Sequence, residues 1–401
     1  MAVGNVLALG FVSLFTDISS EMVTAVLPAF LVLGLHLSML QYGFLDGLYT
    51  GATALTRLLG GYLADRFQQR KLIAGIGYGL SALAKTGLLV VSGSGAVGAV
   101  LAVDRTGKGI RTAPRDALIA ASVEERDLGQ AYGLHRAMDS FGAFLGPLAA
   151  LGVLLAAGTA ASTDAYHAVF LGSLSAGILG LVVLLLFVRN HVAAPRAGAA
   201  TRAETPALSR PRIGSLLHSA PFRRLCLVAV LLSLVTIGDG FVYLVLQDRD
   251  DLPVAAFPLL AVGTSLAFVV LALPLGRLAD RIGRWPVILG GYLSLLAVYV
   301  LLAVGHGPLP LIVGLYGAFY AATDGVLVAL AVPLLPAELR TTGLAVLQTG
   351  QALAYFVSSV LFGLVWQRAG VPSACLAAVL AAVLVLPACG LLLRPRAVAQ
   401  P

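Results

Sequence analysis

Charged residues are scarce in this 401-residue chain, where Asp, Glu, Lys and Arg together make up 11% of the sequence. A soluble domain carries about 25%, because its surface faces water. Apolar residues make up 59%, and they gather in runs near the roughly 20 residues that a helix needs to cross a bilayer. The deficit of charge therefore excludes an ordinary soluble enzyme and indicates a protein whose surface faces lipid.

Cysteine is also rare. The three cysteines, Cys226, Cys375 and Cys389, lie in apolar segments, and an odd number implies no disulfide framework. The sequence has no Walker A phosphate loop, no metal-ligand cluster and no Ser/His/Asp constellation. We therefore predict no catalytic residue, no cofactor and no metal site, and we expect no ATP-driven transport. The first nine residues lack a basic region and an Ala-x-Ala cleavage site, so we interpret them as the start of a spanning helix.

Charged or Pro/Gly-rich hinges divide the apolar sequence into separate segments. They predict an all-α integral membrane protein with twelve transmembrane helices, built as two six-helix bundles. The predicted domains are 1–188, a linker at 189–220 and 221–401. The predicted spans are 4–34, 41–64, 72–92, 95–118, 129–157, 165–188, 221–247, 254–279, 286–305, 308–335, 342–366 and 371–393.

Basic residues are distributed unevenly among the predicted loops. With the N-terminus inside, only Arg249 and Arg368 of the 26 Lys and Arg residues fall in loops of the opposite face. Loops rich in Lys and Arg stay in the cytoplasm, so we predict that both termini are cytoplasmic. This topology also accounts for the net charge of +7 without a nucleic acid partner.

A hinge sequence occurs twice at a constant offset. The first copy runs from Gly61 through Asp65 and Arg66 to Arg70, and the second comprises Gly276, Asp280, Arg281, Gly283 and Arg284, 215 residues further on. A register that holds over this distance indicates a duplicated unit.

This hinge, G-x-L-A-D-R-x-G-R, resembles the signature loop of the major facilitator superfamily, to which the whole chain is similar. The second copy is complete, whereas the first has Gln68 and Gln69 where Gly and Arg are usual. The resemblance implies that both copies form a cytoplasmic gate, in which the Asp accepts hydrogen bonds from helix N-termini and the Arg residues bridge adjacent helices. It also implies a monomer.

Two further motifs resemble elements of that superfamily. Arg105-Thr-Gly-Lys108-Gly is similar to its R-x-x-q-G element, and Gly142-Ala-Phe-Leu-Gly146-Pro147 is similar to the G-x-x-x-G-P element of drug/proton antiporters. Glycines four residues apart let two helices approach closely, and proline bends the span. This second motif is the main reason to expect export.

A closer likeness is to a bacterial subgroup of predicted efflux permeases. It rests on three stretches, which begin at Phe15, Asp104 and His135. The likeness implies a multi-pass protein of the bacterial inner membrane that handles a small-molecule substrate and protons within the lipid bilayer.

Ionisable residues inside the predicted spans are concentrated in the first half. Each costs about 2.5–3.5 kcal/mol at the bilayer centre, so we expect them to pair or to line a wet cavity. Asp17 and Glu21 share one face of the first span, and Arg105 and Lys108 lie close together in the fourth. Asp104 has the spacing to pair with Lys108.

These residues suggest a proton site. Arg136 and Asp139 are three residues apart in the fifth span. Burial and a neighbouring cation shift the proton affinity of a carboxyl in opposite directions. We therefore expect Asp17, Glu21 or Asp139 to titrate, with Arg105 or Arg136 biasing its protonation, and count Lys108 in the same central cavity. Permanent salt bridges that hold the half together are the alternative.

The second half offers polar and aromatic side chains suited to substrate recognition by hydrogen bonds and stacking. The candidate contacts are Asp239, Tyr243, Tyr320, Asp324, Gln348 and Gln351. Aromatic packing is the plainer interpretation of the tyrosines.

The leading hypothesis is a secondary transporter that works by alternating access and exports a small organic or amphipathic compound in exchange for protons. Uptake of a metabolite or metal chelate is the alternative within transport. A transport-inactive sensor or scaffold is the alternative from another class, although it would not need costly charges within the membrane.

Overall fold

A computed structural model describes the backbone at residues 2–67, 69–124, 127–157, 163–189, 219–335 and 340–393, and side chains there except at 2–3, 57–67, 340–341 and 393. Every regular element in these parts is a helix, so the predicted all-α class is confirmed. Helices suit a chain surrounded by lipid, because each satisfies its backbone hydrogen bonds internally.

Several of the helices are long and apolar enough to cross a membrane. Among the described residues these number eight, at Gly4–Gly34, Leu128–Ala157, Thr163–Phe187, Ala220–Asp250, Ala256–Ile282, Arg284–Val304, Leu309–Leu334 and Thr342–Leu392. The last stretch is interrupted at Gly370, whose φ of 80° and ψ of 172° are not helical. The multi-pass character of the chain is thus confirmed, whereas the count of twelve spans stays a prediction.

The chain divides into two compact units. One comprises residues 1–205 with 251–262, and the other comprises 206–250 with 263–401. The predicted domain limits are not tested by this division, and most of the predicted linker at 189–220 lies outside the described residues.

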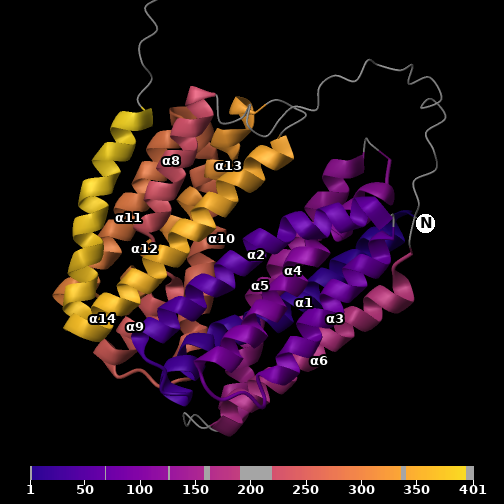
Figure 1. Cartoon of the computed structure of the whole chain (residues 1–401), viewed down its shortest axis with the longest axis horizontal. Coiled ribbons are helices and arrows are strands. Elements are labelled where there is room, and N and C mark those ends of the chain that lie inside the picture. Colours follow the sequence, from indigo (N-terminus) through magenta and orange to yellow (C-terminus); the bar gives the residue numbers. More distant parts are fainter. Residues whose placement is uncertain are drawn as a thin grey trace, which may run out of the picture. The chain divides into compact units, whose positions relative to one another are not determined.

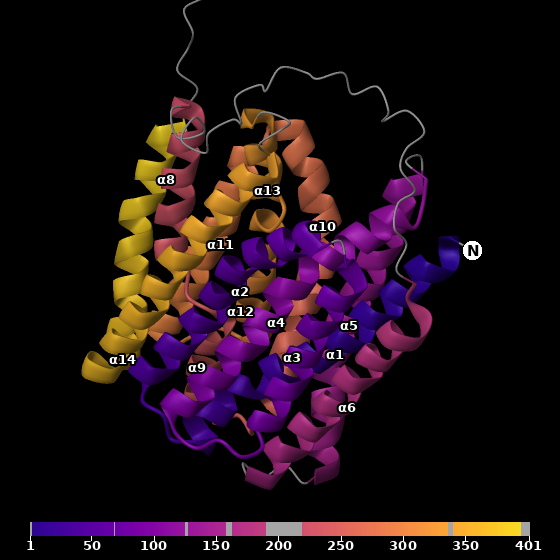
Figure 2. The same cartoon turned by 45° about the vertical axis from the view of Figure 1, so that its right-hand side comes forward.

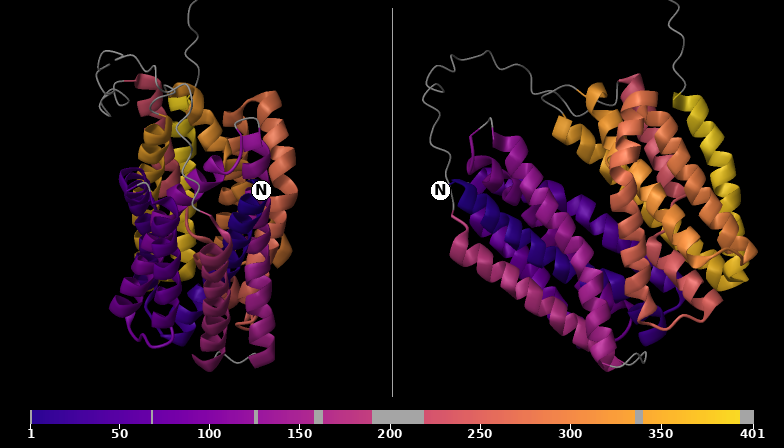
Figure 3. Two further views of the ribbon diagram at one scale, coloured as in Figure 1. Left: turned by 90° about the vertical axis from the view of Figure 1, so that its right-hand side faces the viewer. Right: turned by 180° about the vertical axis from the view of Figure 1, so that it is seen from behind.

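The first unit is a bundle in which α1 lies against α5 and α6, and α4 lies against α2 and α3 (Figure 1). Seen from behind, α6 runs along one edge of this unit (Figure 3). The helices are α1 (Ala2–Ala29, continued by a π-helical turn at Phe30–Gly34), α2 (Met39–Phe67), α3 (Arg70–Gly87), α4 (Ser94–Ala121), α5 (Leu128–Ala157) and α6 (Thr163–Phe187).

Glycines bring α3 and α4 into backbone contact. A Cβ added to Gly77 would lie 2.7 Å from the Gly107 carbonyl oxygen, and one added to Gly107 would lie 2.6 Å from the Gly77 carbonyl oxygen. Small residues at facing positions are the usual means by which membrane helices approach closely. The close approach positions the side chains of α3 beside the charged face of α4.

The second unit packs α14 against α8 and α11, and α11 against α12 (Figure 2). Its elements are α8 (Ala220–Leu234), α9 (Asp239–Asp250), α10 (Ala256–Ile282), α11 (Arg284–Val304), α12 (Leu309–Thr323), α13 (Val326–Ala331), a 3-10 turn (Val332–Leu334) and α14 (Arg340–Leu393). The boundary between the two units falls inside α10.

Two spans predicted as continuous are broken in the structure. The span predicted at 221–247 is interrupted between α8 and α9, and the span predicted at 308–335 is interrupted at Asp324 and Gly325. Asp324 is extended and Gly325 has a φ of 76°, a conformation that glycine adopts without steric cost. Hydropathy does not reveal these breaks, because the flanking residues are apolar on both sides.

Candidate functional site

The interface between α1 and α5 is built around the two glycines of the G-x-x-x-G-P motif. A Cβ added to Gly142 would collide with the Leu14 carbonyl oxygen, and one added to Gly146 would lie 2.9 Å from the Ile18 carbonyl oxygen. Pro147 is buried next to them in α5. Because the helix backbones meet here, short acidic side chains on α1 and α5 can reach one another.

Asp17 on α1 and Asp139 on α5 face each other across this interface. Their side chains lie within hydrogen-bonding distance of each other, so a proton on one carboxyl can be donated to the other. Lys108 of α4 is near enough to interact electrostatically with Asp17 and with Glu21, one turn further along α1. Arg105 also interacts electrostatically with Glu21, and Arg136 lies 3.6 Å from Asp139, so the structure brings together all six residues predicted for the proton site.

The two arginines near Asp139 differ in their surroundings. Arg115 Nη1 lies 3.9 Å from Asp139 Oδ1, and Arg136 Nη1 lies 3.6 Å from Asp139 Oδ2. The Arg136 side chain is 76% exposed and that of Arg115 only 16%. Water or lipid headgroups weaken an exposed ion pair, so Arg115 is the stronger influence on Asp139, although the sequence interpretation gave this role to Arg136.

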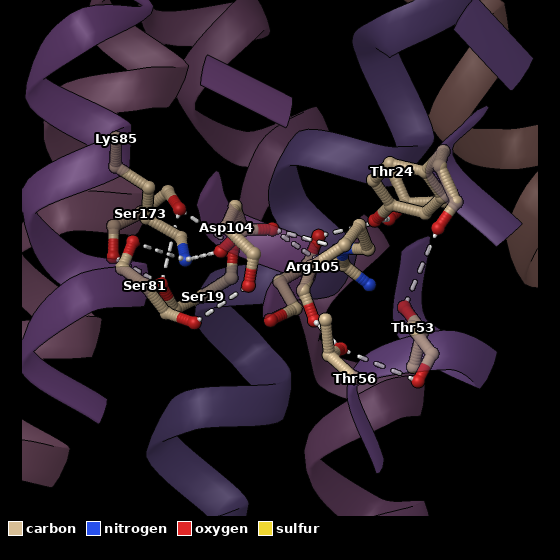
Figure 4. A network of polar contacts seen from close by, with 11 residues as sticks. Ser19, Thr24, Thr53, Thr56, Ser81, Lys85, Asp104, Arg105 and Ser173 are labelled. Atoms are coloured by element: carbon tan, nitrogen blue, oxygen red, sulfur yellow. Dashed lines mark hydrogen bonds and ion pairs between the residues drawn. The ribbon is translucent and has the colours of Figure 1, made fainter. Parts of the chain in front are cut away.

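Asp104 of α4 is shared by two buried cations (Figure 4). Lys85 Nζ of α3 lies 3.4 Å from its Oδ1, while Arg105 Nε donates to its Oδ2 at 3.0 Å. The side chains of Lys85 and Arg105 are 3% and 6% exposed. Asp104 therefore pairs with Lys85 and Arg105, rather than with Lys108 as its spacing in the sequence allowed.

Arg105 also lies over an aromatic ring of a third helix. Its guanidinium carbon is 3.9 Å from the centroid of Tyr49 on α2, a cation–π contact. The Tyr49 hydroxyl is 2.8 Å from Thr24 Oγ1 on α1. Together with Lys85 and Asp104, these residues form a polar network that joins α1, α2, α3 and α4 (Figure 4).

Sequence reasoning missed Tyr49 because a tyrosine on an apolar helix has no charge to draw notice. Lys85 is also ionisable within a predicted span, yet it is not among the residues predicted for the site. The signal that could have found both is the need of Arg105 for partners on neighbouring helices. An arginine in mid-membrane is expected to contact acids or aromatic rings there.

A second cation–π contact involves Arg111, six residues after Arg105 on α4. The guanidinium carbon of Arg111 is 4.6 Å from the ring centroid of Tyr78 on α3. Nearer the end of the helix, Arg115 Nη1 donates to Ser13 Oγ at 3.4 Å, and Ser13 Oγ lies 2.8 Å from His135 Nε2. The buried His135 is thus held by a hydroxyl.

In the second unit, tyrosine hydroxyls form hydrogen bonds with backbone groups in the non-helical segment between α8 and α9. The Tyr299 hydroxyl donates to the Val235 carbonyl at 2.9 Å and accepts from the Ile237 amide at 3.0 Å. The Tyr316 hydroxyl donates to the Ile237 carbonyl at 2.9 Å. An unpaired backbone group within a membrane would cost several kcal/mol, so these hydroxyls stabilise the break.

A pocket of about 350 Å³ adjoins both breaks of this unit. Its walls come from α8, α11, α12, α13 and α14, and include Thr236 near the first break and Asp324 at the second. Four of the six predicted substrate contacts line it, namely Tyr320, Asp324, Gln348 and Gln351.

The remaining two predicted contacts have other positions. Asp239 Oδ1 accepts from the amide of the next residue, Gly240, at 3.0 Å in the first turn of α9. The Tyr243 hydroxyl donates to Thr264 Oγ1 at 2.9 Å, and both side chains are buried. Neither Asp239 nor Tyr243 is among the described residues that line the pocket.

The gate motif is described only in part. The side chains of Gly61, Asp65 and Arg66 lie outside the described residues, and the backbone there belongs to α2. In the second copy, Gly283 has a φ of 98° and ends α10, while Arg284 Nη1 donates to the Ala329 carbonyl of α13 at 2.7 Å. Arg284 thus bridges two helices, whereas Asp280 and Arg281 are exposed.

Among the described residues no group of three His, Cys, Asp or Glu side chains is placed to hold an ion. Asp104 and Asp139 of the first unit instead lie beside Lys and Arg side chains, which compensate their charge.

The sequence is similar to a protein of an archaeon and to one of a mycobacterium. An uncharacterized MFS-type transporter of Methanocaldococcus jannaschii is 29% identical over 384 residues, which cover 90% of this chain and 88% of that protein. An uncharacterized protein of Mycobacterium tuberculosis strain H37Rv is 29% identical over 187 residues, covering 46% of this chain and 44% of the relative.

Solved structures share the fold over nearly the whole chain. The nucleoside transporter NupG superposes with a TM-score of 0.77 at 14% identity, covering 97% of this chain and 99% of that one. A D-xylose-proton symporter gives a TM-score of 0.74 at 17% identity, covering 98% and 97%. At such low identity the likeness establishes the fold and no substrate.

The family model described as Major Facilitator Superfamily matches residues 9–319 and 251–401. These two overlapping matches take in almost the entire chain, including the charged cluster of the first unit and the pocket of the second. The chain belongs to the Major Facilitator Superfamily and is a multi-pass membrane protein of a family of small-molecule transporters.

Proposed function

We propose that this chain is a proton-coupled secondary transporter that exports a small organic or amphipathic compound by alternating access. In this proposal the proton site consists of Asp17 and Asp139, with Lys108 as the neighbouring cation. The chain would work as a monomer in a bacterial inner membrane, with twelve spans and both termini in the cytoplasm.

The observation that carries the proposal is the contact between the carboxyl groups of Asp17 and Asp139. Two carboxylates so close in an apolar surrounding repel each other, and one shared proton removes the repulsion. Such a pair suits a coupling site, because proton release must separate the carboxyls or bring a cation nearer. Movement of α1 away from α5 would separate the carboxyls.

Lys108 is the cation that can approach the carboxylates. It interacts electrostatically with Asp17 and with Glu21, so its ammonium group can compensate either carboxylate when the proton leaves. Its neighbour Arg105 is already committed to Asp104 and Tyr49. Lys108 is therefore the cation whose partner we expect to change during transport.

The direction of transport rests on the G-x-x-x-G-P motif. Gly146 lies against Ile18 and Glu21 of α1, so the motif that resembles drug/proton antiporters also forms the interface that holds the proposed proton pair. This coincidence favours export of the substrate in exchange for protons over its uptake.

Reconstitution of the full chain in proteoliposomes tests the proposal. Under an imposed pH gradient we expect accumulation of members of a panel of small amphipathic dyes, and we expect Asp17→Asn and Asp139→Asn each to abolish it. The same variants should retain dye counterflow without a gradient, because asparagine preserves the shape of the site while removing the titrating group. Gradient-driven accumulation that survives in both variants would show that the proton site is wrong.

A matched control is available on another helix. Asp164 stands in the first turn of α6 and is exposed, so Asp164→Asn should leave both accumulation and counterflow unchanged. If no dye or metabolite shows either activity in the unaltered protein, the transport-inactive sensor or scaffold becomes the better interpretation.

Uptake is the second candidate, favoured by the structural likeness to a D-xylose-proton symporter. The same carboxyl pair would serve a symporter equally well. Vesicles of known orientation distinguish the two: a proton gradient directed into the cytoplasm should drive substrate out of the cytoplasm for an exporter and into it for a symporter.

A further inference from the structure

The described wall of the pocket in the second unit carries a net negative charge. Among its described lining residues Asp324 is the one carboxylate, and no Lys, Arg or His side chain lines the pocket. The remaining polar groups are hydroxyls and amides, such as those of Thr236, Gln348 and Gln351. The wall as described therefore carries a negative charge with no basic side chain to balance it.

Asp324 lies in the non-helical segment between α12 and α13. Its amide donates to the Tyr320 carbonyl at 2.8 Å, which closes α12, and its own backbone is extended. The following Gly325 turns the chain with a φ of 76° so that α13 can begin. Asp324 is exposed, and the described residues hold no ion pair to its carboxylate within 4 Å. The break thus places this carboxylate in the wall of the pocket, where a bound molecule can reach it.

Aromatic rings stand next to the carboxylate. Tyr292, Phe319 and Tyr320 all line the pocket. The Phe319 centroid lies 5.2 Å from the centroid of Tyr292 and 5.2 Å from that of Tyr320. The faces of aromatic rings attract cations, most strongly where water is excluded. The rings and the carboxylate thus both favour a positive charge on a bound molecule.

We propose that this pocket binds the protonated amine of a small organic cation, with Asp324 as its counter-charge and the rings of Phe319 and Tyr320 against its apolar part. Gln348 and Gln351, three residues apart on α14, supply hydrogen bonds to further polar groups. The volume of about 350 Å³ is near the lower end of the range for ligand pockets, which suits a compact amine. The inference rests on the proposed function and names the class of its substrate.

Three probes of one shape but different charge test the inference. They are 1-naphthylmethylamine, 1-naphthylmethanol and 1-naphthoate, titrated calorimetrically into the purified full-length protein. We expect the amine to bind and the alcohol and acid to bind at least roughly tenfold more weakly, the effect of one charge-assisted hydrogen bond. Equal or tighter binding of the alcohol or the acid overturns the proposal, and so does an absence of binding by all three.

Variants assign the charge preference to one residue. Asp324→Asn should weaken binding of the amine roughly tenfold or more and leave binding of the alcohol unchanged, whereas Asp324→Glu should retain the preference. Asp248→Asn, which alters an exposed carboxylate of α9 outside the pocket, should have no effect. Amine affinity that is unchanged in Asp324→Asn overturns the role of this residue.

The binding measurement separates the inference from the function on which it rests. It uses no pH gradient, so loss of proton coupling in Asp17→Asn leaves amine binding intact if the pocket is as proposed. Conversely, failure of gradient-driven transport together with selective amine binding would count against the coupling mechanism only.

Discussion

Lys85 Nζ on α3 lies 3.4 Å from Asp104 Oδ1 on α4, and the same carboxylate accepts a hydrogen bond from Arg105 Nε. One buried acid thus compensates two buried cations. Removing the acid takes away the ion pairs of both cations, whereas removing Lys85 leaves a complete pair of Asp104 and Arg105. The two substitutions should therefore differ sharply.

The first prediction concerns this asymmetry. We expect Asp104→Asn to destabilise the protein by about 3–5 kcal/mol, the usual cost of an uncompensated buried charge, and Lys85→Met to cost much less. Thermal unfolding of the purified variants, compared at equal detergent concentration, measures the difference. Equal losses in the two variants would contradict the shared role of Asp104.

The second prediction concerns the glycines between α1 and α5. Gly146→Val should impair folding or yield strongly, because even a Cβ would lie 2.6 Å from Glu21 Cβ and 2.9 Å from the Ile18 carbonyl oxygen. Gly152→Val is the matched control on the same helix, since nothing lies within 4 Å of a Cβ there. Fluorescence-detected size exclusion reports the fraction of folded protein. A Gly146→Val protein as abundant and monodisperse as Gly152→Val would refute the close approach.

The third prediction concerns the break between α12 and α13. Gly325→Ala should cost about 1–2 kcal/mol, because an L-residue is strained in the left-handed region, even though a Cβ at Gly325 would meet no atom within 4 Å. Gly290→Ala, in helical backbone with equal space, should be neutral or stabilising because alanine favours helix. A comparison of melting temperatures separates strain from crowding. Should both variants melt alike, the break would not have the described backbone.

The fourth prediction separates the ring of Tyr49 from its hydroxyl. Tyr49→Phe keeps a ring beneath Arg105 and loses only the contact with Thr24, a change of about 0.5–1.5 kcal/mol. Tyr49→Leu also removes the cation–π contact, worth about 2 kcal/mol or more when desolvated. Stability measurements should rank the variants wild type, Tyr49→Phe, Tyr49→Leu. Reversal of the last two would contradict the role of the ring.

Much of the arrangement was predictable from the sequence. The all-helical class follows from the long apolar runs, and the family from the repeated hinge at Asp65 and Asp280. The cluster of ionisable groups in the first half was also visible, because each of Asp17, Arg105 and Asp139 interrupts an apolar span. These features depend on residue type and spacing along one chain segment.

Partner choice was less predictable. The spacing of Asp104 and Lys108 suited a pair on one helix, but the structure pairs Asp104 with Lys85 of α3. Which side chain lies opposite Asp104 depends on how closely two helices approach and in what register, and this is set by small residues such as Gly107. The break at Asp324 was missed for a related reason, since hydropathy averages over residues and is insensitive to a single φ angle.

The contact between Gly77 and Gly107 has a mechanical consequence. The ion pair from Lys85 to Asp104 and the hydrogen bond from Ser81 Oγ to the Asp104 carbonyl, at 3.0 Å, cross the same seam. Backbone contact fixes the distance between α3 and α4, and the polar contacts fix their register. The spacing and the register of α3 and α4 are thus fixed at one place, beside Arg105, so a substitution at Gly77 or Gly107 should also disturb the pairing of Lys85 with Asp104.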